Sequence, residues 1–347
     1  MNALAQVQGI DVHTHVVPEQ FPACLSAQAD VPWPSMQHDG CGHAHVMISG
    51  KRYRTVGSAC WDLGERARDM QAMGIARQVL SPMPELLSYW LPLEAACQLI
   101  RFLNDTIAQF VDQDPARFLG LGCVPLQDVD AAVRELDYVM GSLRLQGVEI
   151  ATHVNGVSIG DPRFAPFFER AQALGAAIFV HGLRPAGAER LVGPEALAQM
   201  VAFPGDVALA AASLVTGGTL ERFPDLRVAL SHAGGSFPTV LPRLRRGWQT
   251  IPAVRDSMTV DPSVTARRLY CDHLSYHAPT LRLAMETFGH DKVMIGTDYP
   301  FPVADREPHA SIDALDLGQD LARALRQGNA RRFLGLPDHV CGCPAPA

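Results

Sequence analysis

Short apolar runs recur along the chain and are separated by segments with helical spacing. Eight runs have the length and composition of buried strands, at residues 9–16, 77–81, 118–125, 147–152, 176–181, 227–232, 268–273 and 292–298. Between them, residues 93–113, 129–145, 164–174 and 281–288 repeat apolar positions as an amphipathic helix does. Continuous apolar strands that alternate with helices form a parallel sheet covered by helices. Eight such units predict an α/β protein with a closed (β/α)8 barrel of the TIM type.

An open, doubly wound sheet is the alternative architecture. That fold usually carries a glycine-rich Gly-x-Gly-x-x-Gly turn after its first strand, or a phosphate-binding Walker loop. Neither pattern follows the run at 9–16. The barrel is therefore the favoured interpretation.

Residues 18–62 interrupt the alternation with a segment rich in Pro, Gly, His and Cys, which is long for a simple loop. Residues 45–54 alternate like a hairpin around Ser49-Gly50. We expect a small β insertion after strand 1 that acts as a lid over the barrel mouth. Residues 1–335 should form one barrel domain and 336–347 a loose tail, in which Cys341 and Cys343 could also bind a metal or form a disulfide.

The composition narrows the choice of partners. The chain has 347 residues, 48% of them hydrophobic, which is enough for one barrel or two average domains. A net charge of -7 without a long basic run argues against nucleic acid and anionic membranes, and favours a small-molecule partner. Since we find no signal peptide and no uninterrupted apolar stretch of spanning length, we expect a cytoplasmic protein with reduced cysteines.

Side chains that bind metals stand at the ends of four runs. His13 and His15 lie two residues apart in the first run, where strand alternation turns both imidazoles to the same face. His181, His232 and Asp298 end the fifth, sixth and eighth runs. Because the carboxyl ends of barrel strands meet at one end of the barrel, these side chains should converge. As an alternative, these side chains could only satisfy one another in a polar core. A set of ligand-type side chains that converges on one point instead predicts a site for one divalent metal ion.

Four motifs carry a resemblance to a known family. They are Ile10-Asp-Val-His-Thr-His15, Val180-His181, Ser231-His-Ala-Gly-Gly-Ser-Phe237 and Gly296-Thr-Asp-Tyr-Pro-Phe-Pro302. Together they resemble the amidohydrolase superfamily, and within it the decarboxylase branch typified by aminocarboxymuconate semialdehyde decarboxylase. The resemblance extends from the first strand to Phe333. It implies a distorted (β/α)8 barrel with a small β insertion and one divalent metal ion, zinc, with manganese as the alternative.

The resemblance also implies roles for the convergent side chains. By motif, His13, His15, His181 and Asp298 would be the metal ligands, and His232 would be the acid/base, so that His232 and Asp298 are the candidate catalytic residues. Three neutral imidazoles and one carboxylate with an open position suit a catalytic metal site rather than a closed structural one. A histidine suits proton transfer near neutral pH. As an alternative, His232 could be a second ligand or a structural residue.

Three arginines are candidates for binding a substrate carboxylate. By the same resemblance, Arg54 in the insertion and Arg243 match carboxylate-binding arginines, and the counterpart of Arg243 reaches in from a neighbouring subunit, which implies a homodimer. The sequence departs from the family pattern at Gly182-Leu-Arg-Pro185, where Arg184 could add a cation to the pocket. Arginine suits this role because its planar fork binds a carboxylate through two hydrogen bonds. Exposed, solvated arginines are the alternative.

Two reactions are compatible with these residues. The first is metal-dependent, non-oxidative decarboxylation of an unsaturated or aromatic carboxylate, such as a carboxymuconate semialdehyde, a hydroxybenzoate or a hydroxypicolinate, in aromatic-compound catabolism. The second is hydrolysis or hydration of a lactone, amide or ring-fission product by the same metal site. The products separate them, because only the first releases carbon dioxide. The motif match favours the first.

Overall fold

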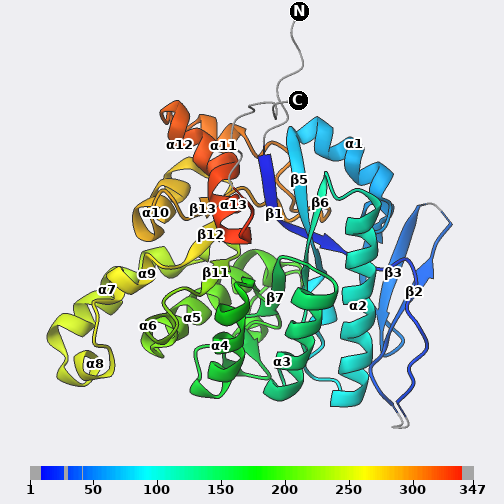
Figure 1. Ribbon diagram of the computed structural model, residues 1–347, viewed down its shortest axis with the longest axis horizontal. Helices are drawn as coiled ribbons and strands as arrows, with labels where there is room; N and C mark the ends of the chain where they lie inside the picture. Colours follow the sequence, from blue (N-terminus) through cyan, green and yellow to red (C-terminus); the bar gives the residue numbers. More distant parts are fainter. Residues whose placement is uncertain (1–8, 27–29, 41, 338–347) are drawn as a thin grey trace, which may run out of the picture.

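A parallel barrel forms the centre of the computed structural model, which describes residues 9–26, 30–40 and 42–337 (Figure 1). Its neighbouring strands are, in order, β1 (Gly9–Val16), β5 (Ile75–Pro82), β6 (Phe118–Gly122), β7 (Gly147–Ala151), β10 (Ala177–His181), β11 (Arg227–Leu230), β12 (Tyr270–Asp272) and β13 (Val293–Met294). The last strand returns to the first at the bridge between Asp11 and Ile295, where the Val12 amide donates to the Ile295 carbonyl at 2.9 Å. This contact closes the barrel and confirms the predicted fold class.

Each predicted apolar run coincides with one barrel strand to within a few residues, and the largest difference is at the carboxyl end of the last one. The run at 292–298 pairs with its neighbour only over Val293–Met294. Beyond this point the amides of Thr297 and Asp298 both donate to the carbonyl of His13, at 3.3 and 2.9 Å. The chain therefore leaves the ladder and turns across the end of β1, which brings Asp298 next to the histidines of that strand.

Helices surround the barrel (Figure 1). The longest, α2 (Leu93–Gln113), matches its prediction and buries a stripe at helical spacing, formed by Ala95, Ala96, Leu99, Ile100, Leu103 and Ile107. The predicted helix at 129–145 ends earlier, since α3 (Val129–Asp137) passes into a π-helical turn at Tyr138–Ser142. The other helices are α1 (Leu63–Met73), α4 (Ala165–Leu174), α5 (Phe203–Thr216), α6 (Thr219–Arg222), α7 (Phe237–Thr250), α8 (Pro252–Ser257), α9 (Pro262–Ala266), α10 (Ala278–Phe288), α11 (Ala310–Asp313), α12 (Gln319–Arg323) and α13 (Asn329–Leu334).

The insertion after β1 contains a separate antiparallel sheet. Its strands β2 (Pro34–His38), β3 (His43–Ile48) and β4 (Lys51–Gly57) lie beyond α2 at the right of Figure 1. The predicted hairpin is confirmed, because β3 and β4 are joined by Ser49 and Gly50 with φ of 52° and 72°, the left-handed conformation of a tight two-residue turn. The boundaries 18–62 stay a prediction. Cys341 and Cys343 lie outside the described residues.

A two-stranded ribbon, β8 (His153–Val154) with β9 (Val157–Ser158), follows β7.

One segment around α5 is apolar enough to be considered for a membrane. Residues Ala198–Thr216 meet the length and composition of a spanning helix. However, 44% of this stretch is buried inside the molecule, where α5 packs against β10 and α7. Core helices have the same character, so the segment is weak evidence for a membrane span.

The barrel interior contains an acidic side chain that the sequence analysis did not single out. Glu149 on β7 is completely buried, and its Oε2 accepts a hydrogen bond of 2.6 Å from Ser81 on β5. Its other oxygen, Oε1, has no hydrogen-bond partner among the described residues. Burial raises the pKa of Glu149 to about 8, since a charge in an apolar interior loses its hydration. The side chain is therefore protonated in the metal-free folded protein at neutral pH.

The substitution Glu149→Gln should change how stability depends on pH. The unfolded chain loses the Glu149 proton near its ordinary value of 4.5, whereas the folded protein keeps it until about pH 8. Between these two pH values, the ionisation of Glu149 in the unfolded chain lowers the free energy of unfolding of the wild type by as much as about 1.4 kcal/mol per pH unit. A neutral amide removes that loss, so the variant should gain stability relative to the wild type as the pH rises from 5 to 8.

Urea denaturation of the metal-free proteins across this pH range measures the effect. Glu94→Gln on the exposed face of α2 is the matched control, and its profile should run parallel to that of the wild type. A Glu149→Gln profile that is also parallel would contradict a protonated Glu149.

Candidate metal centre and active site

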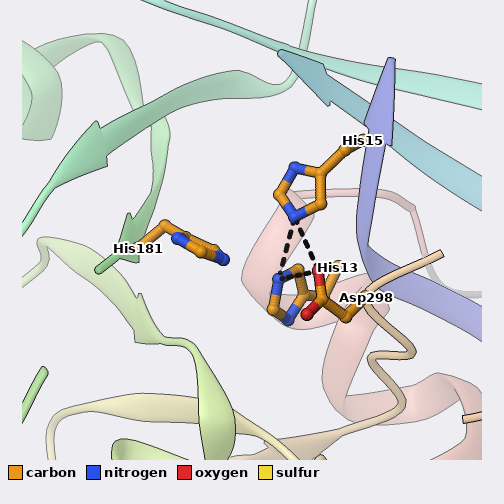
Figure 2. Close-up of side chains that lie close together, drawn as sticks. All are labelled: His13, His15, His181 and Asp298. Atoms are coloured by element: carbon orange, nitrogen blue, oxygen red, sulfur yellow. Dashed lines mark hydrogen bonds and ion pairs between the residues drawn. The ribbon is translucent and has the colours of Figure 1, made fainter. Parts of the chain in front are cut away.

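Four side chains meet at the carboxyl end of the barrel. Figure 2 shows His13 and His15 from β1, His181 from the end of β10, and Asp298 from the segment after β13, all pointing toward one another. One nitrogen or oxygen atom of each lies within 4.8 Å of those of the others. The Nε2 atom of His15 is 3.1 Å from Nε2 of His13 and 3.1 Å from Oδ1 of Asp298. The set that the sequence assigned to a metal is thus brought together.

The far side of each imidazole fixes which nitrogen faces the centre. Nδ1 of His15 donates to a backbone carbonyl at the end of β5 at 3.2 Å, and Nδ1 of His181 donates to the carbonyl of the next residue at 2.8 Å. Nδ1 of His13 lies 2.7 Å from Oδ2 of Asp272. Each ring therefore presents Nε2 inward, and Nε2 of His181 is buried without a partner among the described residues. Histidine ligands of metals are held in this way.

The ionised carboxylate and the neutral imidazoles of the cluster favour a positive charge at its centre. Burial and the charge of His13 lower the pKa of His181 well below its ordinary value, and burial lowers that of His15 to about 4, so both rings are neutral. For His13, burial is outweighed by Asp272 and Asp298, which raise its pKa to about 9. For Asp298, the neighbouring His15 and His13 outweigh burial and hold the pKa well below its usual range.

Without a metal, a proton on His13 supplies that positive charge. Three imidazole nitrogens, one of them unpartnered, and one ionised carboxylate fit a single divalent cation, which would displace this proton.

Asp272 at the end of β12 is a site residue that the sequence analysis missed. Besides His13, its carboxylate accepts hydrogen bonds from the amides of His232, Ala233 and Leu274, at 2.9, 2.7 and 3.0 Å. The hydrogen bond and the charge of His13, with a smaller contribution from the Ala233 amide, outweigh burial and lower the pKa of Asp272. The available signal was its position, because Asp272 is the next-to-last residue of the seventh apolar run and so lies near the same end of the barrel as His181. Asp272 orients His13 and also the turn that carries His232.

Strand β1 is fixed by buried polar groups that do not line the pocket. Asp11 accepts hydrogen bonds from the amide and hydroxyl of Thr297, at 3.1 and 2.7 Å, and so joins β1 to the residue before Asp298. The fully buried guanidinium of Arg66 donates to the carbonyl of His15 at 2.6 Å. The ligands from β1 and from the β13 segment thus share one rigid support.

His232 begins the turn after β11 and lies beside the cluster. Its φ of 56° is left-handed, a strained conformation that the two amide donations to Asp272 stabilise. Close packing of this turn requires glycine at position 235, where a Cβ atom would lie 1.9 Å from the Pro204 carbonyl oxygen. The imidazole Nε2 is 4.0 Å from Oδ2 of Asp298, and burial together with the charge of His13 lowers the pKa of His232. His232 thus faces the pocket as a neutral ring.

A cavity of 490 Å³ opens directly on this centre. Its lining combines His181, His232 and Asp298 with the Arg54 guanidinium and a largely apolar wall that includes Met83, Met200, Phe203, Leu274, Phe301 and Val303. Such a mixture of apolar walls and a few convergent polar groups is typical of small-molecule sites. The insertion thus contributes to the pocket through Arg54, as the sequence predicted.

The other two arginines occupy different positions. Arg184 lines a second cavity of 460 Å³ that adjoins the first, and its guanidinium stacks on Trp90 at 3.1 Å from the ring centroid. Arg243 is exposed on α7, in the arm formed by α7 and α8 that extends from the barrel in Figure 1, and it lines neither cavity. Within one chain, therefore, Arg243 does not reach the pocket.

Comparison with known proteins agrees with this geometry. The family model described as amidohydrolase matches residues 10–336. The 2-amino-3-carboxymuconate-6-semialdehyde decarboxylase of Dictyostelium discoideum is 34% identical over 94% of this chain and 91% of its own, and the gamma-resorcylate decarboxylase of Rhizobium radiobacter is 27% identical over 78% and 86%. Among solved structures, 5-carboxyvanillate decarboxylase from Sphingomonas paucimobilis superposes with a TM-score of 0.72 at 27% identity, over 80% of this chain and 84% of its own. The chain belongs to the amidohydrolase family.

Proposed function

We propose that this protein is a metal-dependent, non-oxidative decarboxylase of an unsaturated or aromatic carboxylate. The observation that carries the proposal is the 490 Å³ cavity, which is lined by His181 and Asp298 of the ligand cluster together with His232 and Arg54. The names of the relatives support the reaction, because those compared above are decarboxylases of carboxylated muconate or benzoate compounds.

Arg54 is suited to hold a carboxylate of the substrate. Its guanidinium lies over the Phe301 ring, 4.2 Å from the centroid, and no carboxylate among the described residues forms an ion pair with it. Its hydrogen-bond donors are thus free for an anionic ligand. Phe301 in turn stacks on His15 at 5.1 Å between centroids, so the arginine is held at a fixed place relative to the cluster.

His232 is suited to relay the proton that decarboxylation needs. Its neutral ring can take up a proton at Nε2 from water or from an acidic group of the substrate and then pass it to the substrate carbon. When the carbon–carbon bond to the carboxylate breaks, carbon dioxide leaves and the electron pair stays on the substrate carbon, which must take up a proton. Nε2 of His232 faces the cavity, while its Nδ1 lies 3.1 Å from the Ser231 hydroxyl, which fixes the ring. A divalent cation bound by the cluster would supply Lewis-acid stabilisation for the negative charge of the substrate.

We assign the cation as zinc, with manganese as the alternative. Three imidazoles and one carboxylate are common zinc ligands, and such a set also accepts manganese. Hydrolysis or hydration of a lactone, amide or ring-fission product would use the same ligands, and it is not favoured because the relatives compared above are decarboxylases.

The reaction is tested by measuring carbon dioxide release from the zinc-loaded protein. A panel of carboxymuconate semialdehydes, hydroxybenzoates and hydroxypicolinates should contain at least one compound that is decarboxylated. The substitution His232→Asn removes the proton donor and keeps a side chain of similar polarity, so it should lower kcat by roughly 10²- to 10⁴-fold with the metal still bound. Full turnover in this variant would exclude the role of His232. Water addition without gas release would replace decarboxylation by the hydrolase alternative.

We also propose that the protein works as a homodimer in which Arg243 of each chain completes the site of its partner. The proposal is supported by the exposure of Arg243 on the α7–α8 arm, and by the half-exposed Val240 and Ile251 on and beside α7, which suit an interface. An inactive Arg243→Ala chain mixed with an inactive His181→Ala chain should regain partial activity, because one mixed site would have both an intact cluster and a partner arginine.

Activity assays after subunit exchange measure this complementation. The control mixes Arg243→Ala with a chain that carries both substitutions, and it should stay inactive because no mixed site is complete. If exchange is demonstrated by mass spectrometry and the first mixture also stays inactive, the shared site is wrong.

A further inference from the structure

A buried acidic side chain stands in the wall that the two cavities share. Five of the lining residues belong to both cavities, and these are Tyr53, Arg54, Glu85, Gln199 and Phe203. Glu85, on the short helical turn Pro84–Leu87 that follows β5, is only 6% exposed. A carboxylate in such a place is costly unless hydrogen-bond donors surround it. Its position in the pocket is not used by any step described above.

The described partners of the Glu85 side chain, Tyr53 and Arg184, do not saturate its two oxygens. The Tyr53 hydroxyl donates to Oε2 at 2.6 Å, and Nε of Arg184 lies 3.4 Å from Oε1, a long contact. A carboxylate offers about four lone-pair sites, so Glu85, which lines both cavities, can accept further hydrogen bonds. Arg184 also stacks on Trp90, which holds the guanidinium beside Glu85 and keeps a compensating charge there.

These contacts leave hydrogen-bond acceptors, and no free donor, at the Tyr53 and Glu85 part of this wall. Because the Tyr53 hydrogen is used on Glu85, the phenol oxygen can only accept from a ligand, and the carboxylate of Glu85 also accepts. Arg54, in contrast, can only donate. A ligand that spans this wall therefore meets a donor for its carboxylate and acceptors beside it.

We propose that Glu85 is a specificity-determining residue that accepts a hydrogen bond from a hydroxyl or amino group of the substrate. The inference rests on the proposed function and narrows the substrate class to carboxylates that bear such a donor on the part of the molecule facing the insertion. A methoxy group or a second carboxylate at this position would leave Glu85 unsatisfied or repel it, so such compounds are disfavoured.

Equilibrium binding tests this role without relying on turnover. Isothermal titration calorimetry of the zinc-loaded protein would compare benzoate with 3- and 4-hydroxybenzoate, the matching aminobenzoates, and the matching methoxybenzoates. At least one hydroxy or amino compound should bind about tenfold more tightly than its methoxy counterpart, as expected for a hydrogen bond to a charged acceptor. If carbon dioxide release failed across all substrates, this preference would still be measurable, so the two proposals fail separately.

Variants then assign the preference to Glu85. In Glu85→Gln the preference should shrink to about twofold, while the affinity for benzoate serves as an internal reference, because a merely structural defect would weaken all compounds alike. Tyr53→Phe should keep the preference, since it leaves the carboxylate in place. Glu195→Gln is the matched control, because Glu195 lines the outer cavity but is exposed. The proposal is overturned if the wild type shows no donor preference, or if the preference persists in Glu85→Gln.

Discussion

Two ring nitrogens that face each other set the constraint on which the rest of the structure depends. Nε2 of His13 and Nε2 of His15 lie 3.1 Å apart, while the opposite nitrogens of both rings are already bound to acceptors. Two lone pairs at this distance repel unless a positive charge lies between them. A proton on His13 satisfies this need in the metal-free protein, and a divalent cation satisfies it better because His181 and Asp298 also point to the same place.

The barrel makes this arrangement possible because it gathers the carboxyl ends of its strands. β1, β10 and the segment after β13 supply the ligands, and β12 supplies Asp272, which holds His13 and the turn of His232 together. Hydrogen bonds of Asp11 and Arg66 hold β1 in place, so the ligands are positioned by hydrogen bonds and not by the metal alone. The pocket beside the cluster then decides the chemistry, through a proton donor at His232 and a cation at Arg54.

Much of the fold and of the candidate site could be predicted from the sequence, for physical reasons. Buried parallel strands are continuous apolar runs, so the eight strands were visible, and ligand-type residues at their ends indicated the cluster. The last strand was predicted too long, because residues after Met294 form only isolated bridges with β1, and the amides of Thr297 and Asp298 both donate to the His13 carbonyl instead of continuing a regular ladder. Glu85 and Glu149 could not be found, since their roles depend on burial and on partners far away in the sequence, such as Arg184 and Ser81.

The central claim is that three imidazoles and one carboxylate, supplied by β1, β10 and the segment after β13, bind one divalent cation beneath the pocket. X-ray absorption spectroscopy of the metal-loaded protein, with the metal content measured on the same sample, tests it most directly. The account predicts one metal ion per chain, with three histidine nitrogens and at least one carboxylate oxygen in its coordination shell. Sulfur ligands, two ions per chain, or an unchanged spectrum in His181→Ala would contradict it.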